Sequence, residues 1–103
     1  MEKEKYRHIV ELEAIYDKQE DLVEKINDLL DQLEESRDGY NKLKEYYHSD
    51  QFLDEYIKSN IGEIPEDIKC GILSEDSIYN LIGDNYYLAI RMIDLASKIL
   101  KDH

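Results

Sequence analysis

The sequence predicts an all-α protein, and three observations carry this prediction. Apolar residues recur every seven positions through the first 48 residues and again near the C-terminus. Apolar residues make up 42% and charged residues 37% of the 103 positions, a mixture typical of helices with one buried and one solvated face. The single proline and two of the four glycines fall together in one middle segment. We therefore expect a helical bundle or a coiled-coil-like arrangement.

The N-terminal part predicts one long heptad helix. With Leu12 at position a, three neighbouring columns are mostly apolar, which makes a stripe wide enough to contact more than one helix. The columns are Leu12, Ile26, Leu33, Tyr40 and Tyr47 at a; Ile15, Leu22, Leu29 and Leu43 at d; and Ile9, Tyr16, Val23 and Leu30 at e. Residues 36–39, with the sequence SRDG, have low helix preference, and the register passes through them unchanged. We expect a kinked continuation there in preference to a hairpin.

A short middle helix is predicted over residues 50–58. Ser49 is a suitable N-cap, and Asp50 complements the helix dipole in the first turn. The period then stops over residues 59–73, where Gly62 and Gly71 permit positive φ and Pro65 removes an amide donor. Five large aliphatic residues remain in this segment, so we expect an irregular connection that packs against the helices.

The last predicted helix begins at Glu75, behind Ser74 as its N-cap. Its apolar columns continue to Leu100, and alanines in them allow close approach of a neighbour. A straight helix over residues 3–47 would be about 68 Å long, whereas one over residues 75–101 would reach about 40 Å. The shorter helix cannot cover the whole apolar stripe of the longer one. Either a kink folds the long helix back on itself, or the middle segment covers the rest of the stripe, or a second molecule does so, which makes a homodimer one of three open solutions.

Length and charge restrict the classes of function. The 103 residues suit a single helical domain spanning 1–103. Residues 1–48 carry 14 acidic and 8 basic side chains (−6), and residues 49–103 carry 11 and 5 (−6), which together give the net charge of −12. This spread acidity argues against direct nucleic-acid binding or an anionic membrane surface, and favours a protein partner with a basic surface.

The compartment expected from the sequence is the cytoplasm. MEKEKYRHIV at the start lacks the apolar segment of a signal peptide, and no apolar run is long enough to span a membrane. Cys70 is the only cysteine, so an internal disulfide is excluded.

One segment carries a family resemblance. The run GILSEDSIYNLI, preceded by EIPEDIK and followed by Arg91 and Met92, resembles a small bacterial helical family defined as a domain of unknown function. The likeness extends to LKEYYHSDQFLDEY upstream and so covers most of the chain. In that family's pattern an aromatic residue, usually tryptophan, takes the place of Phe52, and a basic residue that of Cys70. The resemblance implies a short, mostly helical protein and no particular activity.

Candidate chemistry is sparse, and we predict no enzyme, no cofactor and no metal. Cys70 has no histidine within twenty positions to act as a base, which favours a small, partly buried residue over a nucleophile. Glu45 and His48 match one Glu-x-x-His metal motif, but di-iron bundles need two. The acidic residues near Glu63 and Glu75 lack the spacing of a calcium loop.

Two polar residues and a group of tyrosines remain as candidate interaction features. Gln19 and Asn85 occupy a positions, where an amide either sets helix register or meets water at the edge of the stripe. Tyrosine combines buried area with a hydroxyl that tolerates water, and the chain has nine. The candidate interaction surface consists of Ile72, Leu73, Glu75, Asp76, Tyr79, Tyr86, Tyr87 and Tyr46.

These features favour a small, acidic, non-enzymatic module that acts by protein interaction or self-association. The first alternative is an acidic mimic of nucleic acid that inhibits a DNA- or RNA-binding protein, whose binding would weaken steeply with salt. The second is a small metal-binding or enzymatic helical protein.

Overall fold

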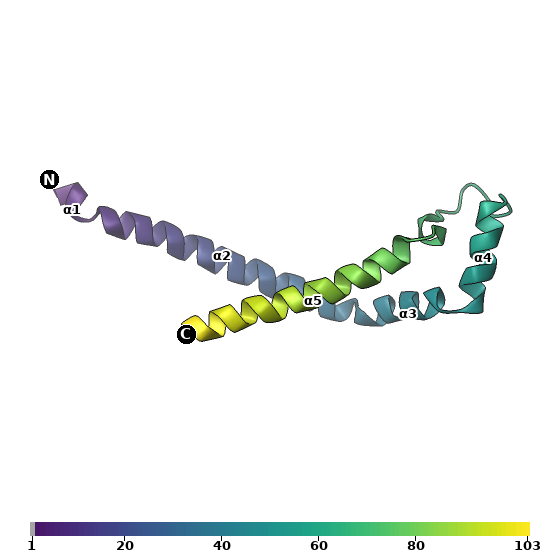
Figure 1. Ribbon diagram of the computed structural model, residues 1–103. Helices are drawn as coiled ribbons and strands as arrows, with labels where there is room; N and C mark the ends of the chain where they lie inside the picture. The colour runs from purple at the N-terminus through teal and green to yellow at the C-terminus, as the bar shows by residue number, and fades with distance from the viewer. Residues whose placement is uncertain (1) are drawn as a thin grey trace. The chain divides into compact units, whose positions relative to one another are not determined.

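The computed structural model describes residues 2–103, which are mostly helical and contain no β-strand (Figure 1). The all-α prediction is therefore confirmed. In chain order the elements are α1 (Glu2–Lys5), α2 (Arg7–Glu35), α3 (Arg37–Tyr47), α4 (Asp50–Asn60), the 3-10 turn η1 (Gly71–Leu73) and α5 (Ser77–Asp102).

The contacts divide the chain into two units, which we describe separately. The first ends at Asp38 and contains α1 and α2; the second is Gly39–His103. No side chain of residues 2–38 is buried, so α2 belongs to a unit without a core of its own. The expectation of one domain over 1–103 stays a prediction.

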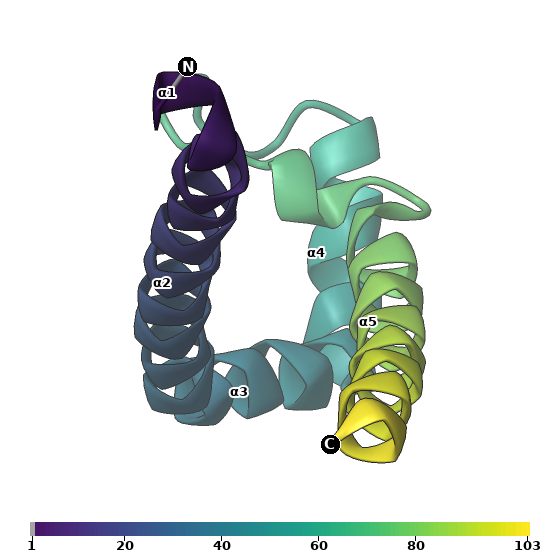
Figure 2. The ribbon, with the colours of Figure 1, turned by 90° about the vertical axis from the view of Figure 1, so that its left-hand side faces the viewer.

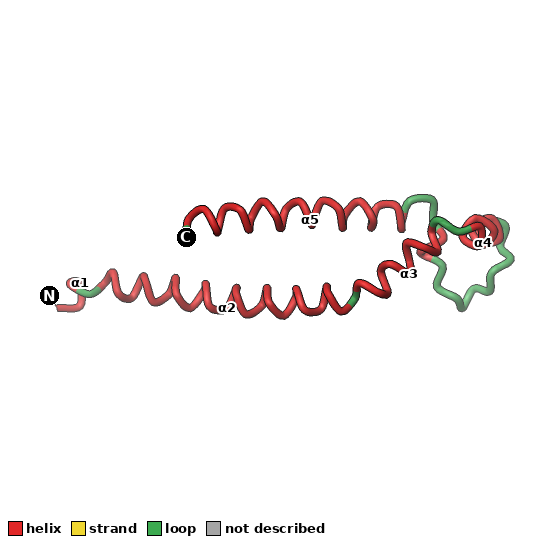
Figure 3. Tube along the Cα trace, turned by 90° about the horizontal axis from the view of Figure 1, so that it is seen from below, coloured by secondary structure: helices red, strands yellow, loops and turns green. Residues whose placement is uncertain are grey.

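The long N-terminal helix is interrupted at Tyr6 and at Ser36. Figure 3 shows short green segments between α1 and α2 and between α2 and α3. Ser36 has φ −79° and ψ −7°, a departure from the helical ψ of about −42°. Its amide still donates to the Gln32 carbonyl at 3.0 Å, and its hydroxyl donates to the Leu33 carbonyl at 2.7 Å. The weak point predicted at 36–39 is thus confirmed as an interruption of one residue, and the kink stays a prediction.

The second unit confirms the predicted middle helix and its cap. Ser49 is extended, with φ −96° and ψ 159°, and its hydroxyl accepts the Phe52 amide at 3.2 Å. The same hydroxyl donates to the Tyr46 carbonyl at 2.6 Å, which ties the end of α3 to the start of α4. The helix continues to Asn60, two residues beyond the predicted end.

Gly62 ends α4 through a Schellman motif. The Glu63 amide donates to the Lys58 carbonyl at 2.9 Å, and the Gly62 amide donates to the Ser59 carbonyl at 3.2 Å. Gly62 has φ +78°, the left-handed region that glycine adopts without steric cost. Gly71 does not use this freedom, because its φ is not positive.

We expect Gly62→Ala to lower the free energy of unfolding by about 1–2 kcal/mol, because an L-residue is strained in the left-handed region. No atom lies within 4 Å of a Cβ built at Gly62, so the cost is confined to the backbone. Gly83→Ala is the matched control: its Cβ would also meet nothing within 4 Å, and its helical backbone should gain up to about 1 kcal/mol. Urea unfolding followed by circular dichroism measures both changes, and equal stability of the two variants would contradict the assignment.

The core of the second unit forms where η1 lies between α4 and the first turns of α5 (Figure 2). Leu73 is 8% exposed and Ile78 is 2% exposed, and these are the buried apolar side chains among the described residues. The connection from Ile61 to Cys70 follows the surface: Ile61 and Ile68 are exposed, and Ile64 is half-buried. The expected packing of the connection therefore depends chiefly on Leu73.

The predicted start of the last helix at Glu75 was two residues too early. Ser74 does act as a cap, since its hydroxyl accepts the Ser77 amide at 3.1 Å and also bonds the Ser77 hydroxyl. However, Asp76 has φ −127° and ψ −4°, which is outside the helical range, so the regular helix begins at Ser77.

Candidate functional site

The apolar stripe of α2 is exposed from Ile9 to Leu30. Its nine large side chains between Ile9 and Leu30 are each between 39% and 61% exposed. A helix of 29 residues is about 43 Å long. Side chains of this kind are normally buried against another helix, so the stripe is the largest candidate binding surface of the first unit.

Charged residues flank this stripe unequally. One edge carries Glu13, Glu20 and Glu34, and the other carries Glu11, Lys18 and Lys25. Lys25 is paired within the helix to Asp21 at 2.8 Å, and the Tyr16 hydroxyl donates to Glu20 at 2.9 Å. Over α2 as a whole, 10 acidic and 3 basic side chains give a net charge of −7.

The two predicted polar a residues differ in their surroundings. Gln19 is exposed on the α2 stripe. Asn85 is half-buried, and its side-chain amide donates to the Leu81 carbonyl of its own helix at 2.9 Å. This internal hydrogen bond satisfies one of the two N–H donors of the Asn85 amide within its own helix.

Tyr46, predicted as a surface residue, instead belongs to an aromatic cluster across the α3–α4 turn. Its ring packs edge-on against Phe52 at 5.6 Å between centroids, and Phe52 also contacts Tyr47 at 5.0 Å and Tyr56 at 6.1 Å. The Tyr46 hydroxyl donates to Glu55 at 2.9 Å. Partial burial and the bonded carboxylate raise the pKa of the Tyr46 phenol to about 12, so it stays a neutral donor. The cluster joins α3 to α4.

The predicted surface around η1 is divided between core and solvent. Leu73 is a core residue, so its assignment to an interaction surface is corrected: the 3-10 turn directs it between α4 and α5. Ile72 is 45% exposed, and Glu75 and Asp76 are exposed beside it.

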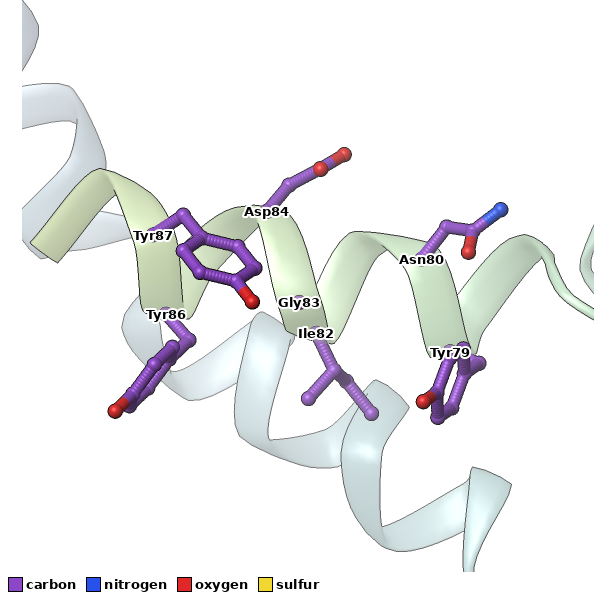
Figure 4. Close-up of a pocket in the computed structure, with 7 residues that line it drawn as sticks. All are labelled: Tyr79, Asn80, Ile82, Gly83, Asp84, Tyr86 and Tyr87. Atoms are coloured by element: carbon purple, nitrogen blue, oxygen red, sulfur yellow. The ribbon is translucent and has the colours of Figure 1, made fainter.

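The three predicted tyrosines of α5 gather around one shallow hollow (Figure 4). Tyr79, Tyr86 and Tyr87 are each 64–70% exposed. The hollow has a volume of about 680 Å³, and all of its lining residues come from α5, so it is an open flank of one helix. In Figure 4 the side chains of Tyr79, Ile82 and Tyr86 project to one side, whereas Asp84 projects to the other.

Sequence reasoning missed Ile82 and Gly83, which lie between the tyrosines in this hollow. A helical signal was available, because Ile82 and Gly83 follow Tyr79 by three and four positions and precede Tyr86 by four and three. Gly83 leaves the space between the two rings open, since nothing lies within 4 Å of a Cβ built there.

Cys70 and His48, the two residues singled out for possible chemistry, each have a local contact. The Cys70 thiol is half-buried and donates to the Ile68 carbonyl at 3.2 Å. His48 packs its ring against Tyr47 at 5.1 Å. Within residues 2–103, no three histidine, cysteine or acidic side chains gather as metal ligands.

None of the helices formed by residues 2–103 has an apolar stretch long enough to cross a membrane.

Comparison with known proteins identifies a family. None of the curated proteins compared with the chain matches it. A family model described as Domain of unknown function (DUF4298) matches residues 9–95, a range that runs from the start of the α2 stripe almost to the end of α5. Because this match covers most of the sequence, the chain belongs to the DUF4298 family.

Proposed function

We propose that this protein is a non-enzymatic interaction module of the cytoplasm whose α2 stripe binds an amphipathic helix of a protein partner. The observation that carries the proposal is the continuous exposure of nine large apolar side chains on one face of α2. Such a face binds another helix by packing against its apolar face, through apolar side chains spaced three, four and seven residues apart.

Charge specifies the kind of partner. Because α2 has a net charge of −7, a partner helix with basic residues along the edge that meets Glu13, Glu20 and Glu34 is complementary, and an acidic helix is repelled. Charge supplies orientation and rate of encounter in this arrangement, while the apolar stripe supplies most of the affinity.

A photo-crosslinking amino acid placed at Val23 tests the proposal in the native cell, with Val10 as the matched control. Both are exposed valines of α2, at 56% and 70%, but Val23 lies on the stripe and Val10 lies off it. We expect an adduct with a different polypeptide from Val23 and little from Val10. Adducts of equal yield from both positions, or crosslinks from Val23 only within the same chain, would contradict the proposal.

A further inference from the structure

The C-terminal half of α5 has no buried or half-buried side chain. Ile78, Ile82 and Asn85 are buried or half-buried, whereas every residue from Tyr86 onward is exposed. The largest exposed fractions are those of Leu100 at 75% and Ile93 at 71%. These two residues follow Tyr79 and Tyr86 at intervals of seven or multiples of seven, so all four lie in one column.

The apolar arc of α5 is wider than a single neighbour covers. The arc has two sides. One side consists of Leu88, Met92, Leu95 and Ile99; the other consists of Ile90 together with the column that contains Ile93. At 100° per residue these columns span about 200° of the helix, against roughly 100° for a helix with one packed face. We call the second side the outer face: Tyr79, Tyr86, Ile90, Ile93 and Leu100.

Charge separates α5 from the rest of the chain. Asp84, Asp94 and Asp102 are balanced by Arg91, Lys98 and Lys101, so α5 is neutral in a protein of net charge −12. Two α2 helices would instead bring together two charges of −7. Of the two exposed apolar helices, α5 is therefore the one that tolerates a second copy of itself.

The order of side chains favours an antiparallel pair. Next to the outer face lies a column of residues spaced by seven: Asn80, Tyr87, Asp94 and Lys101. If two α5 helices run antiparallel and cross near Ile90, this column places Tyr87 opposite Asp94 of the second copy, and Asn80 opposite its Lys101. A parallel pair would place Asp94 against Asp94 and Lys101 against Lys101, which is repulsive. Gly83 precedes Ile90 by seven positions in the same column, and nothing lies within 4 Å of a Cβ built there, so it leaves room beside the outer face for a second helix.

The available area matches a small, reversible interface. Tyr79 and Tyr86, 65% and 64% exposed, offer about 100–160 Å² each, and the three aliphatic residues about 100 Å² each. The sum is about 500–620 Å² per chain, or about 1,000–1,240 Å² for a pair, which is the size of a weak, reversible interface.

From exposure, charge and area together, we infer that the outer face of α5 is the contact surface of an antiparallel homodimer centred near Ile90. This inference rests on the proposed interaction function and deepens it, because it names a second copy of the chain as the partner of a second surface.

Sedimentation equilibrium of the full chain, from micromolar to submillimolar concentration, tests the dimer. We expect the mass to rise from 12.3 kDa toward twice that value. Ile93→Glu should weaken the dimer by about 100-fold or more, since it places an unpaired charge in the contact. Lys98→Glu is the control, because Lys98 lies on the polar side of α5. A monomer at all concentrations, or equal dimerisation of the two variants, would overturn the inference.

Orientation and independence are tested with two further measurements. In a Cys70→Ser background, Ile90→Cys should form an intermolecular disulfide and Leu100→Cys should not, whereas a parallel dimer would crosslink through both. If Ile93→Glu is monomeric but still gives the Val23 adduct, the dimer and the proposed partner site are separate. If the full chain dimerises but the crosslinker at Val23 gives no adduct with another polypeptide, the proposed function is contradicted and the dimer is not.

Discussion

Replacement of Ile78 by alanine is expected to lower the free energy of unfolding of the second unit by about 2–4 kcal/mol. Ile78 is 2% exposed and Leu73 is 8% exposed, and these two are the buried apolar side chains among the described residues. A unit of this length has a total stability of about 3–10 kcal/mol. Because no larger core shares the loss, this substitution removes a large part of the stability.

Ile93→Ala is the control for this prediction, since Ile93 lies on the same helix and is 71% exposed. It should change the free energy of unfolding by less than about 0.5 kcal/mol in the monomer. Urea unfolding at low micromolar concentration, followed by circular dichroism, compares the two variants. Equal loss in both would show that Ile78 is no core residue.

Substitution of Ile26 by glutamate is expected to weaken binding of the partner found through Val23 by about 100-fold or more. Ile26 is at the a position in the middle of the stripe and is 48% exposed. A buried, unpaired carboxylate costs at least about 2.7 kcal/mol, which corresponds to a factor of 100 in affinity. Because the side chain has no core to support in the free unit, folding should be little changed.

Val10→Glu provides the matched control for Ile26→Glu. It also changes an exposed apolar residue of α2 to glutamate, but at a position off the stripe. Titration calorimetry with the identified partner gives both dissociation constants. If the two substitutions have similar effects, added negative charge and not loss of the apolar contact would explain the weakening.

The elements that local chemistry determines were predictable from the sequence. Ser49 supplies a cap for α4, and Gly62 supplies the left-handed residue that ends it, and both roles depend only on neighbouring backbone groups. The interruption at residues 36–39 was predictable in the same way, although its limitation to Ser36 depends on two particular hydrogen bonds.

The core was less predictable because it depends on tertiary contacts. Leu73 and Ile72 are adjacent aliphatic residues in an aperiodic segment, and only the geometry of η1 decides that Leu73 is buried and Ile72 is exposed. The start of α5 depends likewise on the backbone of Asp76, because the side-chain preferences of Glu75 and Asp76 suit either beginning.

The candidate surfaces were predictable in part. Heptads identify which residues of α2 share a face, but not whether another element of the chain covers that face. Tyr46 and Tyr86 illustrate the limit: both belong to tyrosine doublets, yet Tyr46 packs on Phe52 and bonds Glu55, whereas Tyr86 is 64% exposed. The difference arises from the α3–α4 turn, which brings Phe52 of α4 against Tyr46, whereas no aromatic residue of another helix lies against Tyr86 among the ring contacts of the described residues.

The salt dependence of the partner's dissociation constant tests most directly whether the apolar stripe, and not acidity, holds the complex. If the stripe supplies most of the affinity, raising the salt from physiological to several times that concentration should weaken binding by less than about tenfold. An acidic mimic of nucleic acid would instead lose about 10³-fold or more over a comparable range, as phosphate-binding surfaces do. A loss of that size would contradict the proposed function.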